Sequence, residues 1–314
     1  MKLNQLIHED SLISHLEVAK TFKDANGILL GKQLTHVDPK IFQKLYPDNV
    51  FLNSGISIDN SGGFTNQIQK LRISEKGGFR DANDRGSNKG LISLDGEAAT
   101  IGVIERTATI NYSDTEIEQA KLGNYNLVER LLGATDKIYR QEIDEILAVG
   151  NTLNKGLLNY AGFTADTGSA ITTASLGTSD YDQIASLITD QWNGVNNTNG
   201  YMANRIVMPT RVMNILSSKK WNAAVSEKSV LQILRETFPS VTLMSSWRNE
   251  LVGATSITIA YSTSEDAMSN RIPLPLLIGK TVPDGSFGYR ADAKYRIAGL
   301  DVHENKAGRI VTGL

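Results

Sequence analysis

A stretch of alternating residues followed by a long polar loop most limits what this chain can fold into. Leu71 and Ile73 alternate with polar neighbours, the period of two that is typical of a half-exposed β-strand. The segment 74–90, SEKGGFRDANDRGSNKG, carries four glycines and seven charges, which predicts a long hairpin with a polar tip. A two-stranded ribbon is marginally stable alone in water, and no helical pattern lies within this one to cover a face. It must therefore lie on its own subunit or on a neighbour, and we favour the neighbour.

A second alternating stretch follows the ribbon. Ala108, Ile110 and Tyr112 alternate with polar residues, whereas Ile101 and Val103 upstream occupy odd positions. The apolar phase thus reverses near Ile104, and a β-bulge or kink is the simplest cause.

The strongest helical signal comes next. Ser113 and Glu116 have capping-box spacing, and a short first turn runs to Gly123 and Asn124. Apolar residues then mark one face of a helix that ends at Gly150: Leu127, Leu131, Ala134, Ile138, Ile146 and Leu147. About 24 helical residues would span roughly 36 Å, so this segment is predicted to be a strut. Nothing in the stretch after it, GNTLNKGLLNYAGFT, looks like a catalytic nucleophile, a metal ligand or a phosphate cradle.

The remaining chain predicts mixed α and β structure. Helices are expected from Ser179, through Val212 and Leu216, and over 226–238; strands are expected at 205–208, 241–245 and 256–261. Strict alternation returns at the end, where six residues share one face: Phe287, Tyr289, Ala291, Ala293, Tyr295 and Ile297. A turn at 305–308 and a strand at 310–312 are expected to close a hairpin.

The composition excludes several classes of protein. The 314 residues are 40% hydrophobic and 21% charged, which fits a folded soluble protein. A net charge of −2 argues against a basic nucleic-acid-binding surface, and the absence of cysteine rules out disulfides and thiol chemistry. The N-terminal residues lack the apolar run of a secretory signal, and no segment approaches the roughly 20 apolar residues of a membrane helix.

Candidate chemical motifs fail when they are tested one by one. His8 and His15 are interpreted as solvated or interface residues, and Glu142, Asp144 and Glu145 as a solvated helix face rather than catalytic acids. The calcium-loop start at Asp81 has a cation at its fifth position and lacks the late glutamate. Three further partial matches, to a phosphate-binding loop, a Ser-x-x-Lys motif and a nucleophile elbow, are rejected. Each lacks other residues that the complete motif requires. We predict no catalytic residue, no metal and no cofactor.

The order of the parts resembles a known family. An N-terminal arm, a charged hairpin, a strut helix, a glycine-rich exit, an α/β region and returning strands resemble the major capsid protein of tailed bacteriophages. That protein has the Hong Kong 97-type fold, which encapsulin shells share. The most specific matches are the helix end Ala148-Val149-Gly150, the segment Gly156 to Gly162, and the terminal stretch 287–313 with Ala298-Gly299-Leu300.

The resemblance implies an α+β capsid fold with five parts. These are an N-terminal arm (1–50), an E-loop hairpin and peripheral-domain strand (51–112), a peripheral domain with the spine helix (113–164), an axial domain (165–284) and peripheral closing strands (285–314). It implies inter-subunit contacts at the E-loop tip, through Arg80, Asp81, Asp84, Arg85 and Lys89. It also implies spine-helix packing by Leu127, Leu131, Ile138 and Ile146, and a hinge to the axial domain at Gly150, Gly156 and Gly162.

The implied function is structural. Copies would assemble into hexamers and pentamers of an icosahedral or prolate phage head that encloses double-stranded DNA without sequence-specific binding. Because the resemblance begins close to Met1, we expect scaffolding from a separate protein. A portal and a decoration protein are further candidate partners, with assembly in the host cytoplasm and location in the virion. No partner for a cross-link through Lys70, Lys76 or Lys89 can be matched, so we predict none.

Two alternatives remain. An encapsulin-like compartment shares the fold and would enclose protein cargo in a smaller shell. A soluble enzyme, with a site assembled from residues distant in sequence, is the remote alternative.

Overall fold

The computed structural model describes residues 49–314 except 82–89, 175, 197–200, 223–225 and 251–254. The chain divides into two units between Asp48 and Asn49, and every described residue belongs to the second. All but the last two residues of the expected N-terminal arm, including His8 and His15, lie outside the described residues.

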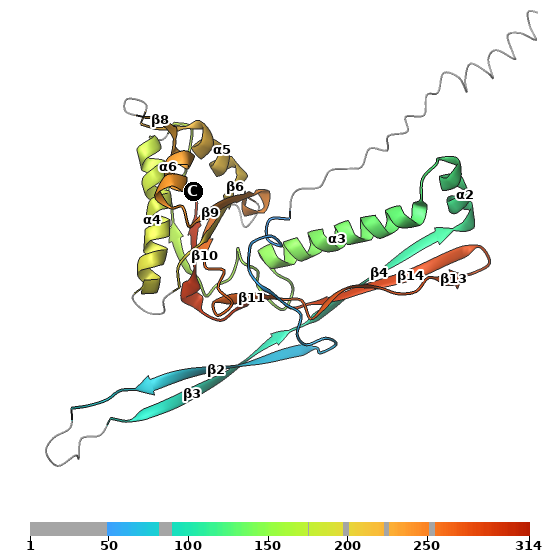
Figure 1. Ribbon diagram of the computed structural model, residues 1–314, viewed down its shortest axis with the longest axis horizontal. Helices are drawn as coiled ribbons and strands as arrows, with labels where there is room; N and C mark the ends of the chain where they lie inside the picture. The colour runs from blue at the N-terminus through green and yellow to red at the C-terminus, as the bar shows by residue number, and fades with distance from the viewer. Residues whose placement is uncertain (1–48, 82–89, 175, 197–200, 223–225, 251–254) are drawn as a thin grey trace, which may run out of the picture. The chain divides into compact units, whose positions relative to one another are not determined.

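The predicted ribbon is present. Strands β2 (Gln67–Gly77) and β3 (Ile92–Gly102) pair antiparallel along their whole length, from Gln67 opposite Gly102 to Gly77 opposite Ile92 (Figure 1). Val103 then interrupts the strand, and β4 (Ile104–Ser113) pairs with β14 (Gly288–Ile297) instead. The phase reversal near Ile104 therefore marks a kink at which the chain leaves one sheet and joins another.

Strand β14 is the centre of a four-stranded sheet. One edge of β14 pairs with β4, and the other pairs with β12 (Leu274–Ile278) and β13 (Val282–Asp284). Its alternation is confirmed from Ala291 to Ile297, where every second side chain is buried; Phe287 is 72% exposed.

Two helices follow β4 as predicted. The capping box of α2 (Asp114–Leu122) is formed by Ser113 and Glu116. The strut helix α3 (Leu127–Val149) has 23 residues, about 34 Å at 1.5 Å per residue, and lies along β4 and β14 (Figure 1). It ends where Gly150 takes a φ of 96°.

A five-stranded mixed sheet separates two hydrophobic clusters. Its strands, in spatial order, are β5 (Thr164–Thr167), β16 (Gly308–Thr312), β10 (Ile257–Tyr261), β6 (Arg205–Pro209) and β9 (Thr242–Ser246). Ile206 and Met208 face the cluster formed with α4 (Gly177–Asn196), α5 (Thr210–Ser218) and α6 (Val230–Thr237). Val207, Ile259 and Tyr261 face the cluster that holds the C-terminal end of α3.

Two expectations are corrected. The helix predicted over 226–238 begins only at Val230, because β8 (Ser226–Ser229) pairs with β7 (Lys220–Asn222) and Ser229 caps the helix. The expected closing hairpin is wrong, because β16 joins the five-stranded sheet. Strand β15 (Gly299–Val302) instead joins β11 (Met268–Arg271) and β1 (Ile58–Asp59). Alternation shows that a segment is a strand but does not identify its partner.

The short 3₁₀ helices η1 (Trp247–Glu250) and η2 (Asn305–Ala307) complete the described elements. Among the helices described, none has the length and apolarity needed to cross a membrane.

Candidate assembly interface

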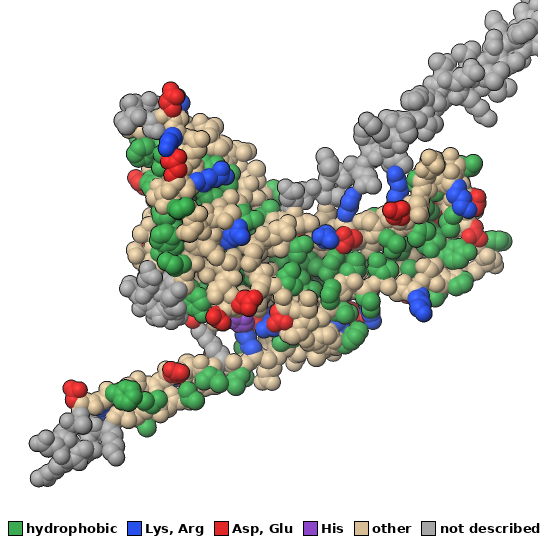
Figure 2. Space-filling model, in the orientation of Figure 1, with side chains coloured by type: hydrophobic (Ala, Val, Ile, Leu, Met, Phe, Trp, Pro, Cys, Tyr) green, Lys and Arg blue, Asp and Glu red, His purple; other side chains and the backbone are tan. Residues whose placement is uncertain are grey.

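The β2–β3 ribbon has one apolar and one polar face. The register places Leu71 opposite Ala98, Ile73 opposite Gly96 and Glu75 opposite Leu94, so these residues share a face with Ile92. We call Leu71, Ile73, Ile92, Leu94 and Ala98 the apolar face. Their four large side chains are 58–70% exposed. Hydrophobic side chains are visible along the ribbon in Figure 2.

The opposite side of the ribbon is polar. It carries Lys70, Ser74, Lys76, Ser93, Asp95 and Glu97, and apolar residues lie on it only toward the root, where Ile68 stands opposite Ile101 and Lys70 opposite Ala99. Lys76 forms an ion pair with Asp95 on this side. Only one face is therefore suited to solvent, and the other lacks cover from its own chain.

The root of the ribbon is fixed to the body of the chain. Lys70 forms an ion pair with Asp301, whose side chain is 1% exposed, and donates to the Val302 carbonyl at 3.0 Å. Arg271 donates to the other Asp301 oxygen at 3.2 Å. Arg296 donates to Glu105 at 2.6 Å and to the Thr65 carbonyl at 3.0 Å. These contacts set the direction in which the ribbon leaves the body.

Ser269, His303 and Asp301 meet in the arrangement of a catalytic triad and bear on the enzyme alternative. The Ser269 hydroxyl lies 3.3 Å from Nε2 of His303, but Nδ1 of His303 is 3.8 Å from Asp301, beyond hydrogen-bond distance. Asp301 is already bonded to Lys70 and Arg271, and Ser269 is only 5% exposed. Burial lowers the pKa of the His303 imidazole. This group is an ion network at the ribbon root. The only sequence signal for it is an acidic residue between Leu300 and Val302.

The predicted E-loop tip is only partly described. Arg80 and Asp81 are exposed beyond the end of β2, whereas Asp84, Arg85 and Lys89 lie outside the described residues. Their contacts with other subunits stay a prediction.

The spine helix packs mainly through its C-terminal end. Ile146 is buried, Leu127 and Leu131 are half-buried, and Ile138 is 53% exposed. The N-terminal half of the apolar stripe is therefore largely open in a single subunit.

In the acidic cluster on this helix, Glu142 and Glu145 are exposed as expected, but Asp144 is not part of a solvated face. Asp144 is 3% exposed and accepts from the Phe51 and Leu52 amides at 2.7 and 3.1 Å and from Arg248 at 3.1 Å. Burial raises the pKa of the Asp144 carboxyl above its ordinary value. The hydrogen bonds from the two amides and the positive charge of Arg248 lower the pKa in part. Asp144 thus holds the start of the described chain against the spine helix.

The glycines after the helix form a close-packed corner. A Cβ on Gly150 would lie 2.4 Å from the Asn154 carbonyl oxygen, and one on Gly156 would lie 2.5 Å from the Ala148 oxygen. The returning chain bonds to the helix end, since the Leu157 amide donates to the Leu147 carbonyl at 2.8 Å. At Gly162, a Cβ would lie 2.5 Å from the Tyr160 ring. A Cβ would clash with backbone atoms at Gly150 and Gly156 and with side chains at Gly162. A hinge role for the three glycines stays a prediction.

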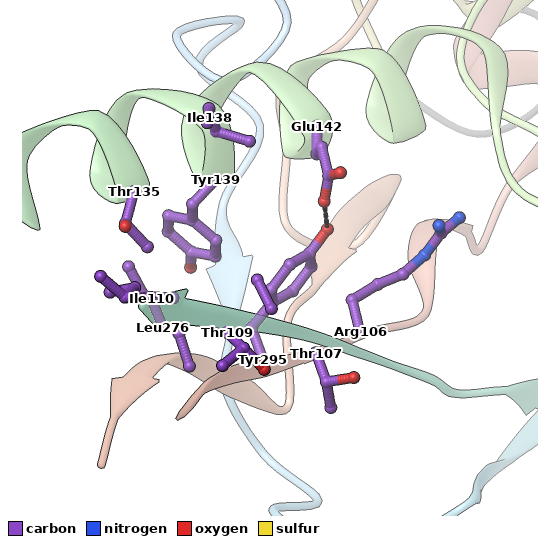
Figure 3. A pocket seen from close by; sticks show the side chains of 12 residues that line it. Arg106, Thr107, Thr109, Ile110, Thr135, Ile138, Tyr139, Glu142, Leu276 and Tyr295 are labelled. Carbon is purple, nitrogen blue, oxygen red and sulfur yellow. Dashed lines mark hydrogen bonds between the residues drawn. The ribbon is translucent and has the colours of Figure 1, made fainter. Parts of the chain in front are cut away.

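A recess of about 240 Å³ lies between α3, β4, β14 and β12 (Figure 3). Its walls include Ile110, Ile138, Tyr139 and Leu276, and Arg106 lies at its edge. Tyr295 donates to Glu142 across it, and burial followed by this carboxylate raises the pKa of the Tyr295 phenol. We call this site the spine recess.

Comparisons with known proteins place this geometry in a family. The family model described as "Major capsid protein" matches residues 85–314. The structure titled "The capsid of Myoviridae Phage XM1" is 39% identical, with a TM-score of 0.81, over 90% of this chain and 98% of that one. No curated protein matches the sequence.

More distant structures share the fold. A structure of Mycobacterium phage Che8 is 16% identical with a TM-score of 0.62, and the capsid of a native GTA particle is 16% identical with a TM-score of 0.65. Each match covers 88% of this chain and 95% of the other. The expected α+β capsid fold is confirmed, and the protein has a structural, non-enzymatic role in a virion shell built from many copies. This chain belongs to the major capsid protein family.

Proposed function

We propose that this protein forms the hexamers and pentamers of a phage head around double-stranded DNA, with each ribbon supported by an adjacent copy. The observation that carries the proposal is the apolar face, whose large side chains are 58–70% exposed in a single chain. Burying apolar surface contributes about 25 cal/mol per Å². A contact repeated in every copy therefore favours a closed shell.

The charge and the relatives support the finer details. A chain with a net charge of −2 offers incoming DNA little electrostatic attraction, which suits a container that does not bind its contents specifically. The 39% identity to a myovirus capsid favours a phage head over an encapsulin-like compartment. Assembly in the host cytoplasm, with a portal, a separate scaffolding protein and a decoration protein as partners, belongs to this proposal.

A paired substitution on the ribbon tests the mode of assembly. Leu71→Asp with Ile73→Asp places two charges on the apolar face, and Ser93→Asp places one on the polar face of the same ribbon. We expect the double variant to stay folded but to form no closed particles in negative-stain micrographs. The Ser93 variant should assemble as the unchanged chain does. Normal particles from the double variant would disprove the role of the apolar face.

A further inference from the structure

We infer that protonation of His303 detaches one of the two contacts that hold the ribbon to the body of its own chain, so that the ribbon becomes able to pivot at its root. With the imidazole neutral, both contacts are made and the ribbon keeps one direction. The inference concerns a single copy of the chain. It therefore goes beyond the proposed function and needs no shell for its test.

The two contacts lie at different positions along the ribbon. At the first, Arg296 donates to the Thr65 carbonyl at 3.0 Å and to the Asn66 side chain at 3.3 Å. At the second, Lys70 forms its ion pair with Asp301. Lys70 comes four residues after Asn66, about 13 Å along an extended strand. Two separated contacts fix the direction of the ribbon, whereas the first contact alone would leave it free to swing.

The second contact shares its carboxylate with His303. Lys70 pairs with Oδ1 of Asp301, and Nδ1 of His303 lies 3.8 Å from the same oxygen. Arg271 occupies the other oxygen, Oδ2, at 3.2 Å. The His303 side chain is 27% exposed, so it can exchange a proton with solvent. Because an imidazolium donates from both ring nitrogens, protonated His303 competes with Lys70 for Oδ1.

The surroundings of the cations decide which one leaves. Asp301 is 1% exposed, and three cations around one buried carboxylate repel one another with little screening by water. Arg271 keeps a second carboxylate, that of Asp59. Lys70 keeps only the Val302 carbonyl among the described residues, and its side chain is 22% exposed, so its ammonium group can move into water. Protonation of the imidazole therefore expels Lys70.

The groups that face His303 place this change at acidic pH. Burial lowers the pKa of the imidazole. The Asp301 carboxylate on β15 and the Asp266 carboxylate before β11 raise it. Lys70 on β2 and Arg271 on β11 lower it. The resulting pKa lies below the ordinary 6.5, so the second contact is complete above pH 6.5 and is lost as the pH falls below it.

Single-molecule fluorescence energy transfer tests the inference on separate copies. The chain has no cysteine, so Glu75→Cys on the ribbon and Ser186→Cys on α4 can carry the two dyes, and both positions are exposed. Picomolar concentration keeps copies from assembling. The distribution of transfer efficiency is recorded from about pH 8 to about pH 4, a range that spans the ordinary pKa values of histidine and the carboxylates.

Three variants of the labelled chain identify the groups. We expect the unchanged residues to give a narrow distribution at about pH 8 that broadens by about pH 5. His303→Gln should stay narrow at both, and Lys70→Gln should be broad at both. Lys76→Gln is the matched control, because Lys76 lies on the same face of β2 but its ion pair with Asp95 stays within the ribbon. This variant should behave as the unchanged residues do.

A narrow distribution from Lys70→Gln at about pH 8, or acid broadening that persists in His303→Gln, would overturn the inference. Should His303→Gln fail to fold, the unchanged residues decide the role of the imidazole. Broadening with a midpoint between about 5 and 6.5 supports it, and a midpoint near 4 would assign the change to carboxylates and overturn it. None of these measurements involves particles, so each leaves the proposed function to be judged by its own test.

Discussion

Asp144 occupies a position whose burial the helical pattern does not reveal. Its neighbours Glu142 and Glu145 are exposed, and the spacing of the three acids predicted a solvated face. Its partners Phe51 and Arg248 lie 93 and 104 residues away in sequence. A buried carboxylate of this kind is defined by distant donors, so local pattern alone could not identify it.

Replacing Asp144 by alanine should therefore destabilise the subunit strongly. The change leaves two backbone amides and the Arg248 guanidinium without their acceptor, and breaking a buried pair in this way costs about 3–5 kcal/mol. Urea unfolding of the unassembled chain measures the loss. Glu145→Ala is the matched control, because that side chain is 64% exposed and its pair with Arg248 should contribute only about 0–1 kcal/mol. Equal losses in both variants would contradict the buried role.

His303 should make the stability of the subunit depend on pH. Burial lowers the pKa of its imidazole below the ordinary 6.5. The Asp301 carboxylate raises this pKa, and the Lys70 and Arg271 cations lower it. The unfolded chain then binds the proton more readily, so this contribution to stability is complete above pH 6.5 and is lost as the pH falls below it.

Unfolding midpoints at about pH 8 and about pH 5.5 measure this effect. His303→Gln should lose less stability over that interval than the unchanged chain, because the glutamine does not titrate. The same decline in both proteins would assign the pH dependence to other groups.

At the scale of elements, signals carried by neighbouring residues predicted the structure well. Ser113 and Glu116 form the capping box, and Gly150 ends the spine helix. Two strand pairings were missed: the partners of β16 lie far away in sequence, and the short local pair of β7 with β8 before α6 leaves no mark in the periodicity. The alternation of Leu71 and Ile73 predicted one apolar face of β2, whereas the β3 residues that share this face became visible only with the register, as with Ala98 opposite Leu71.

Two glycine-to-alanine changes, one inside the spine helix and one at the residue that follows it, should act in opposite directions. Gly150 has a φ of 96°, and a Cβ there would meet the Asn154 oxygen at 2.4 Å, so Gly150→Ala should destabilise the corner. Gly133 lies inside α3 with nothing within 4 Å of a Cβ, and Gly133→Ala should stabilise the helix by about 0.5–1 kcal/mol. Thermal unfolding of the two variants compares them. A harmless Gly150→Ala would show that the corner can open freely, as a loose hinge would.

At the scale of the whole molecule, two features could hold copies together. The mixed charges of the ribbon tip suit inter-subunit pairing, but exposed pairs contribute only about 0–1 kcal/mol each. The apolar face offers four large side chains whose burial contributes roughly 1.5–3 kcal/mol each when complete. The contribution of the apolar face is the larger of the two, so the stability of the shell should respond to salt and temperature as hydrophobic burial does.

Salt distinguishes these two sources of shell stability. At about 1 M NaCl the screening length falls to about 3 Å, which removes most of the attraction between exposed charges and leaves apolar burial intact. Assembled particles should therefore keep their size in light scattering after transfer to this salt concentration. Cooling, which weakens hydrophobic association, should loosen them more than salt does. Particles that dissociate in salt but resist cold would instead identify the charged tip as the main contact. The stability of the shell would then depend mainly on Arg80, Asp81 and their neighbours rather than on Leu71 and Ile73.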